Sequence, residues 1–178
     1  ESIDKALAMD VDHISAYHLT VEPGTALKKL IEKGKYPNPS DQVSMDQFDI
    51  LMHKLSENGY EHYEISNFAR RKKYSKHNSN YWLNKPYLGF GPSAHSYDLH
   101  SRRWNVKNMK QYFEGVESNN QYFEIEKLSR ADRFNEFVML GLRTIWGVDL
   151  KNMENIFGVD LKNQFLEALK IHLNDENV

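Results

Sequence analysis

The residues best suited to chemistry lie in one short stretch, residues 77–82, which reads His-Asn-Ser-Asn-Tyr-Trp. A neutral imidazole such as that of His77 is a good ligand for heme iron, and the rings of Tyr81 and Trp82 could stack on a flat macrocycle. Nearby arginine and lysine side chains could pair with the carboxylates of such a ligand. The alternative is that His77 and Asn78 hydrogen-bond a loop into shape while the aromatic rings pack, and residue types alone favour it.

A second stretch, residues 89–97, combines small residues with a histidine. Gly89 and Gly91 would let the backbone approach a ligand closely, since glycine has no Cβ. The spacing is neither the G-x-G-x-x-G of a dinucleotide site nor the GK[ST] of a phosphate-binding loop. His95 is a second possible ligand or polar contact, but the stretch alone is nonspecific.

Polar residues also follow two predicted strands. Glu64, Ser66 and Asn67 come at the end of a strand expected near residues 60–66, and Thr20 follows an earlier strand in the same way. Ligands of α/β sheets gather at the carboxyl ends of strands, so these positions are suited to binding. Ordinary turn chemistry is the alternative interpretation.

The elements that would position these residues follow from hydrophobic spacing. Residues 13–19 alternate like a strand, and so do residues 60–66. Between them, the apolar residues from Phe48 to Leu55 follow the i, i+3, i+4, i+7 spacing of a helix, and Gly59 stands where it should stop. A helix between two strands predicts that the strands are parallel in one sheet, as the last repeats of a larger α/β sheet or barrel.

The rest of the chain divides into an irregular part and a helical part. Residues 67–105 are rich in Gly, Pro, Ser, Asn and aromatic residues with no helical period, although residues 87–91 could form a strand. Further on, Ser129 and Asp132 resemble a capping box. The sequence Gly-Val-Asp-Leu-Lys-Asn then occurs twice, from Gly147 and again from Gly158, and each copy places an Asp where a helix could begin. This pattern predicts a helix-turn-helix or winged-helix-like appendage.

Composition narrows the function classes. The 178 residues include no cysteine, which excludes disulfides, zinc–cysteine sites and an iron–sulfur cluster held by cysteines of this chain. Apolar runs are too short to span a membrane, and we expect a cytoplasmic protein. The chain opens at Glu1 inside a helical pattern and without an initial methionine, which suggests a fragment.

Charge is distributed unevenly. Residues 70–104 contain eight lysines or arginines and one acid, so this segment has a formal charge of +7 and the remainder −9. A basic segment rich in Tyr and Trp could meet phosphates, nucleic acid or carboxylate-bearing ligands. A solvated loop is the alternative.

Taken in order, these stretches resemble the oxygen-independent coproporphyrinogen III oxidase-like radical S-adenosylmethionine (SAM) family, and within it the heme-chaperone branch. Each motif is modest, but five in a fixed order are specific. The stretches that carry the resemblance are residues 13–25, 59–69, 77–82, 87–96 and 139–143, with Arg103-x-Asn105 and Tyr112 between them.

The resemblance implies a fold of the α/β class. Residues 1–124 would be the C-terminal part of a radical SAM partial (β/α) barrel, with the Gly- and aromatic-rich segment. Residues 125–178 would be a small, mainly helical, winged-helix-like C-terminal domain. We expect this domain to be cut short at Val178. In this family a C-x-x-x-C-x-x-C loop holds a [4Fe-4S] cluster that binds SAM, and that loop would precede Glu1. The chain alone should therefore perform no radical chemistry, and no catalytic residue is expected in it.

The resemblance also implies roles for particular residues. Residues 77–82 depart from the dehydrogenases of the family and are similar to its chaperones, so heme is the expected ligand and His77 its best candidate contact. The candidate heme-binding residues are His77, Asn78, Tyr81, Trp82 and His95. The candidate SAM-binding residues are Thr20, Gly91 and His95. Further candidate pocket residues are Glu64, Ser66, Asn67 and Arg103.

Three functions remain open at this point. The first is a heme chaperone that binds heme and delivers it to acceptor proteins. The second is the dehydrogenase that converts two propionates of coproporphyrinogen III to vinyl groups. The third, a nucleic-acid-binding module, is disfavoured because the acidic remainder of the chain would repel a phosphate backbone.

Overall fold

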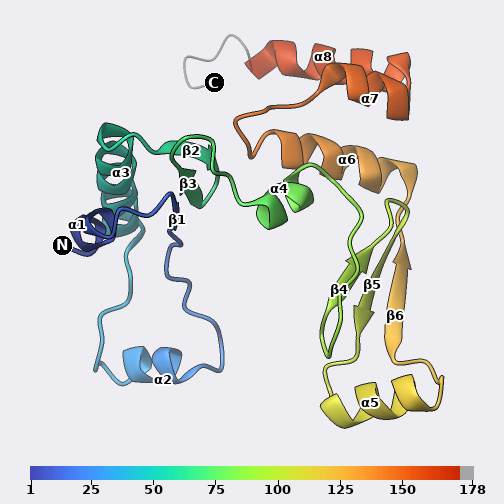
Figure 1. Cartoon of the computed structure of the whole chain (residues 1–178), viewed down its shortest axis with the longest axis horizontal. Helices are drawn as coiled ribbons and strands as arrows, with labels where there is room; N and C mark the ends of the chain where they lie inside the picture. Colours follow the sequence, from blue (N-terminus) through green and yellow to red (C-terminus); the bar gives the residue numbers. More distant parts are fainter. Residues whose placement is uncertain (173–178) are drawn as a thin grey trace. The chain divides into compact units, whose positions relative to one another are not determined.

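The computed structural model describes residues 1–172 and divides into two units, Glu1–Ser75 and Lys76–Val178 (Figure 1). In the first unit, Thr25 caps a short helix by accepting a hydrogen bond from the backbone N–H of Lys28, and Ser40 caps the long helix in the same way. The elements of this unit are α1 (Ser2–Ala8), β1 (His13–Ser15), α2 (Ala26–Glu32), α3 (Asp41–Glu57), β2 (Glu61–Glu64) and β3 (Asn67–Ala69).

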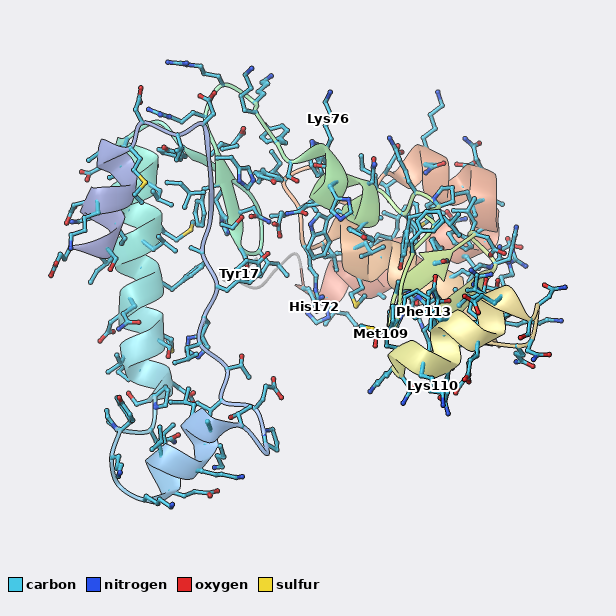
Figure 2. The ribbon with its side chains drawn as sticks, turned by 60° about the horizontal axis from the view of Figure 1, so that its bottom comes forward. Tyr17, Lys76, Met109, Lys110, Phe113 and His172 are labelled. Atoms are coloured by element: carbon cyan, nitrogen blue, oxygen red, sulfur yellow. The ribbon has the colours of Figure 1, made fainter. Side chains whose placement is uncertain are left out.

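The sheet of the first unit has the order β1-β3-β2, and β3 is antiparallel to both neighbours. β1 and β2 therefore run in the same direction in one sheet, as the sequence predicts for two parallel strands. β3 lies between them, because the chain reverses at residues 65–66 after β2. The predicted strand 13–19 is also shorter: Tyr17 lies on the extended segment after β1 and is 73% exposed (Figure 2).

The core of the first unit joins α3 to the sheet. Leu55, Tyr60 and Phe68 form a cluster in which none is more than 5% exposed. Ile3 and Leu7 of α1 pack against this cluster. The apolar face of α3 expected from the sequence is therefore the face that covers the sheet.

The second unit contains a second antiparallel sheet of order β4-β5-β6, and three helices follow β6 in the chain (Figure 1). Its elements are α4 (Lys76–Trp82), β4 (His95–Tyr97), β5 (Ser101–Asn105), α5 (Met109–Glu117), β6 (Phe123–Lys127), α6 (Arg130–Gly141), α7 (Leu150–Phe157) and α8 (Val159–His172).

The segment 67–105 is more regular than its composition predicts. It holds β3, α4, β4 and β5. The sequence missed α4 because a polar helix of seven residues is too short to show a hydrophobic period. The strand expected at residues 87–91 is not formed, and Tyr87 instead makes an isolated β-bridge with Tyr97.

The C-terminal helices follow the predicted signals. Ser129 and Asp132 form the capping box of α6, and Asp149 caps α7 by accepting from the backbone N–H groups of Lys151 and Asn152. α7 ends at Gly158, whose φ of 84° favours glycine. The boundary expected between residues 124 and 125 falls within β6 and stays a prediction about how the chain divides into domains.

Within residues 1–172, no helix has the length and apolar character needed to cross a membrane.

We expect Met153→Ala to lower the free energy of unfolding by about 2–5 kcal/mol, because the side chain of Met153 is fully buried and its loss leaves a cavity. The matched control is Met109→Ala on α5, whose side chain is 63% exposed (Figure 2). Urea denaturation of both variants checks this. Equal losses of stability would contradict the assignment of Met153 to the core.

Candidate functional site

An aromatic row runs from α4 to the second sheet. His77 and Tyr81 are one helical turn apart, and their ring centroids lie 5.0 Å apart in an edge-on contact. The ring of Tyr81 is 4.7 Å from that of Tyr87, and Tyr87 is 6.0 Å from Tyr97 of β4. Both Tyr87 and Tyr97 have pKa values raised by burial, so their phenols stay protonated. The row is an aromatic surface with an imidazole at one end.

The imidazole of His77 is accessible. Its side chain is exposed, and neither ring nitrogen has a hydrogen-bond partner among the residues that the structure describes. Tyr81 is 41% exposed beside it. An unbonded, solvent-facing imidazole can accept a metal ion or a hydrogen-bond donor, so this end of the row can act as a ligand.

Trp82 faces a different part of the same unit. It lines a cleft of about 110 Å³ together with Phe137 and Leu140 of α6 and with Val148. Its neighbour on the helix, Asn78, is half-buried. The structure therefore brings His77 and Tyr81 together and turns Trp82 toward the C-terminal helices.

The glycine-rich stretch is a turn shaped by its hydrogen bonds. A Cβ at Gly89 would lie 2.2 Å from the carbonyl oxygen of His95, so no other residue fits there. Gly91 has a φ of 98°. Its N–H donates to the hydroxyl of Tyr112 at 3.1 Å, and its carbonyl accepts from the amide of Asn105 at 2.9 Å. The N–H and the carbonyl of Gly91 therefore both have partners within the chain, and these bonds hold the turn in shape.

His95 and Arg103 lie on opposite faces of one sheet. His95 pairs with Trp104 and Ser96 pairs with Arg103 in the β4–β5 register. Successive residues of a strand point to opposite faces, so one face carries His95 with Trp104 and the other carries Arg103. The rings of His95 and Trp104 are stacked with centroids 6.3 Å apart. A single small pocket cannot use both His95 and Arg103.

In the first unit, the predicted polar residues bond to one another. Glu64 is 4% exposed and accepts from the side-chain amide of Asn67 and from the backbone N–H of Ser66. The amide oxygen of Asn67 accepts from Ser15 Oγ at 2.5 Å. These contacts shape the turn between β2 and β3. Thr20 is exposed in the loop that leads to α2.

Sequence reasoning missed a histidine–tyrosine pair in the first unit. His13 Nε2 is 2.8 Å from the hydroxyl of Tyr63, which also accepts from the backbone N–H of Ser75 at 3.1 Å. Burial lowers the pKa of His13 and raises the pKa of Tyr63. Strand alternation packs the half-buried Ile14 against the core and puts His13 on the other face of β1. This alternation was the signal in the sequence that could have identified His13.

Metal and cofactor chemistry is limited by the residue types. The chain has no cysteine, so it cannot supply the thiolates that hold an iron–sulfur cluster. Within residues 1–172, no group of three or more His, Cys, Asp or Glu residues is gathered to hold a metal ion. The imidazoles of His77 and His95 are exposed. Each could supply one axial ligand to an iron atom that a macrocycle already holds through its own donor atoms.

Comparison with protein families gives one match and a set of relatives. Residues 128–173 match the HemN C-terminal domain. The chain is 36% identical over 170 residues to the protein "Heme chaperone HemW" of Bacillus subtilis, covering 95% of this chain and 45% of that protein. It is 40% identical over 113 residues to the protein of the same name in Mycobacterium tuberculosis H37Rv, covering 64% of this chain and 29% of that protein.

A relative from an animal and a solved structure extend the comparison. "Radical S-adenosyl methionine domain-containing protein 1, mitochondrial" of Danio rerio is 42% identical over 95 residues, or 53% of this chain and 21% of that protein. The coproporphyrinogen III oxidase (HemN) structure from Escherichia coli has a TM-score of 0.71 at 20% identity, covering 94% of this chain and 42% of that one. This likeness shows the fold alone. The chain thus spans about half the length, or less, of the proteins it matches.

Because of the His13–Tyr63 pair, we expect the free energy of unfolding to depend on pH. A pKa below the ordinary value means that the folded state favours neutral His13, while the unfolded chain takes up a proton below about pH 6.5. This contribution to stability is complete above that pH and is lost as the pH falls toward the folded pKa. We expect unfolding free energies measured at about pH 7.5 and about pH 5.5 to differ more in the wild type than in His13→Phe, which cannot titrate. Equal pH dependence in the two proteins would contradict the prediction.

Proposed function

Because the chain belongs to the radical SAM family related to coproporphyrinogen III oxidase, with relatives in its heme-chaperone branch, we propose that it binds heme and delivers it to acceptor proteins. The names of the relatives at 36% and 40% identity support this function. The chain spans 45% of the Bacillus subtilis relative, so the activity proposed is that of the whole protein.

The aromatic row of the second unit is the observation that carries the proposal. His77 presents an unbonded imidazole at the end of a series of aromatic rings formed by Tyr81 and Tyr87. Heme needs an axial ligand for its iron and apolar surface for its ring, and this arrangement can supply both. In the proposal, His77 contacts the iron, Tyr81 contacts the ring, and Asn78 and Trp82 hold α4 in place.

His95 is the second candidate heme contact. Its exposed imidazole is stacked on Trp104, so that face of the sheet also combines a nitrogen ligand with a flat indole. His77 has the more extended aromatic surroundings, and for this reason we place the iron there rather than at His95.

The SAM part of the proposal concerns the whole protein. The family uses a [4Fe-4S] cluster and SAM, and we propose SAM contacts at Thr20, Gly91 and His95. The residues of this chain do not fit the cluster, because none is a cysteine. Glu64, Ser66 and Asn67 would shape the end of the sheet next to such a ligand. We further propose that the protein works in the cytoplasm, where the absence of disulfides is usual.

Replacing His77 tests the proposal. We expect His77→Ala to weaken hemin binding by the full-length protein by about tenfold or more and to shift the Soret band, because an axial ligand is lost. The control is His53→Ala, whose side chain is exposed on α3 and lies beside Glu57. An absorbance titration with hemin checks both variants. Unchanged binding in His77→Ala would move the contact to His95, and a wild type that binds no hemin would contradict the function.

The family's other activity gives a second test. Incubation of the full-length protein with SAM, a reductant and coproporphyrinogen III should give no vinyl product, because the proposed function needs no decarboxylation. Chromatography of the porphyrins after oxidation measures this. Conversion of propionates to vinyl groups would make the protein a dehydrogenase instead.

A further inference from the structure

The sheet of the second unit has one open edge. In the order β4-β5-β6, β6 pairs with β5 on one side and with no strand of residues 1–172 on the other (Figure 1). The opposite edge of the sheet is protected, because Tyr87 exchanges two backbone hydrogen bonds of 2.9 Å with Tyr97 of β4. An open edge presents unpaired backbone N–H and C=O groups, and another extended chain can pair with them.

The register of β5 and β6 identifies the backbone groups that face this edge. Val106 donates to the carbonyl of Tyr122, and Leu128 donates to the carbonyl of His100. In an antiparallel pair, the residues that bond to the other strand alternate with residues whose backbone groups point away from it. The residues of β6 with outward-pointing backbone groups are therefore Phe123, Ile125 and Lys127.

Most of these outward groups are free to bond. The side-chain amide of Gln121 donates to the carbonyl of Phe123 at 3.0 Å, which occupies one acceptor. The N–H and C=O groups of Ile125 and Lys127 have no hydrogen-bond partner among the residues that the structure describes. The strand also lacks two features that commonly prevent edges from pairing, since it contains no proline and its register against β5 is continuous. The edge is thus suited to pairing with another chain.

The side chains of β6 define which chain would fit. Ile125 is 54% exposed on one face of the sheet, where it borders a cleft of about 280 Å³ together with Leu88. Glu124 and Glu126 lie on the other face, both are exposed, and neither forms an ion pair in the described part of the chain. Opposite charges on facing strands are stabilising. The matching strand has an apolar residue opposite Ile125 and a basic residue on each side of it.

A second copy of this chain matches poorly. Antiparallel pairing of two β6 strands about Ile125 would set Glu124 of each copy opposite Glu126 of the other. Like charges directly opposite each other are destabilising, and here the repulsion occurs twice. The charges of β6 therefore disfavour self-pairing and favour a basic partner.

We propose that the open edge of β6 binds an extended segment of a partner protein in which an apolar residue stands between two lysines or arginines. The segment adds a strand to the β4-β5-β6 sheet. Its apolar residue exchanges backbone hydrogen bonds with Ile125, and its basic residues pair with Glu124 and Glu126. This inference goes beyond the proposed function and does not depend on heme binding.

A short peptide tests the site in the full-length protein. The ligand is a fluorescein-labelled peptide with blocked ends, Thr-Lys-Val-Lys-Val-Lys-Thr, and fluorescence anisotropy measures its binding. We expect saturable binding that weakens by about tenfold or more when both valines are N-methylated, because the peptide then loses N–H groups that bond to the edge. No saturable binding of the unmethylated peptide, or equal binding of the methylated one, overturns the proposal.

Charge reversal on β6 tests where the peptide binds. The double variant Glu124→Lys, Glu126→Lys should bind the lysine peptide about tenfold or more weakly and should gain binding of the same peptide with glutamate in place of lysine. The control double variant is Glu117→Lys, Glu167→Lys, which makes the same change in net charge at two exposed acids of the same unit. Circular dichroism confirms that both variants fold. Equal affinity of the two double variants for the lysine peptide contradicts the proposed position.

Sedimentation velocity tests the alternative occupant, a second copy. Ile125→Pro removes the outward N–H without removing a bond to β5, so an edge strand can accept it. We expect the full-length wild type and Ile125→Pro to sediment alike and the variant to lose affinity for the lysine peptide. A wild-type dimer that Ile125→Pro dissociates would assign this edge to a second copy and overturn the proposal.

Discussion

The buried side chain of Asn105 is the contact on which the shape of the second unit depends. It is 2% exposed, its amide donates to the carbonyl of Gly91, and its backbone N–H donates to Ala94. The first of these bonds fixes the turn with positive φ, and the second continues the β4–β5 pairing toward that turn. Since that pairing sets which residues alternate, it also decides that His95 and Arg103 face opposite sides of the sheet. The turn then returns the chain so that Tyr87 bridges to Tyr97.

Two kinds of surface follow from this geometry. The aromatic row from His77 to Tyr87 lies on the face of the sheet that carries His95 and Tyr97, because Tyr87 pairs with Tyr97. The cleft on the opposite face contains the guanidinium of Arg103, whose Nε has no hydrogen-bond partner. A flat aromatic ligand such as heme can lie on the aromatic row, where burial raises the pKa of Tyr87 and keeps its phenol protonated.

Much of the fold could be predicted from local chemistry. Helix α3 has a clear hydrophobic period, and the Ser129 capping box and the cap at Asp149 depend on residues within one turn of each other. Pairing of strands depends on contacts distant in sequence, and for this reason the insertion of β3 between β1 and β2 was not predictable. The same limit applies to the candidate site. Residue types identified His77 and Arg103, but only the register of β4 and β5 shows that Arg103 and His95 are on opposite faces of the sheet. The unpaired state of Arg103 has no signal in the sequence.

A map of where a porphyrin contacts the protein tests the proposed function most directly. Zinc protoporphyrin IX is diamagnetic, so its titration into ¹⁵N-labelled full-length protein reports contacts through chemical-shift changes without loss of nearby signals. We expect the largest changes on α4 around His77 and on Tyr87. Changes confined to the β1-β3-β2 sheet, or to the face of β4 and β5 that carries Ser96 and Arg103, would contradict the proposed function.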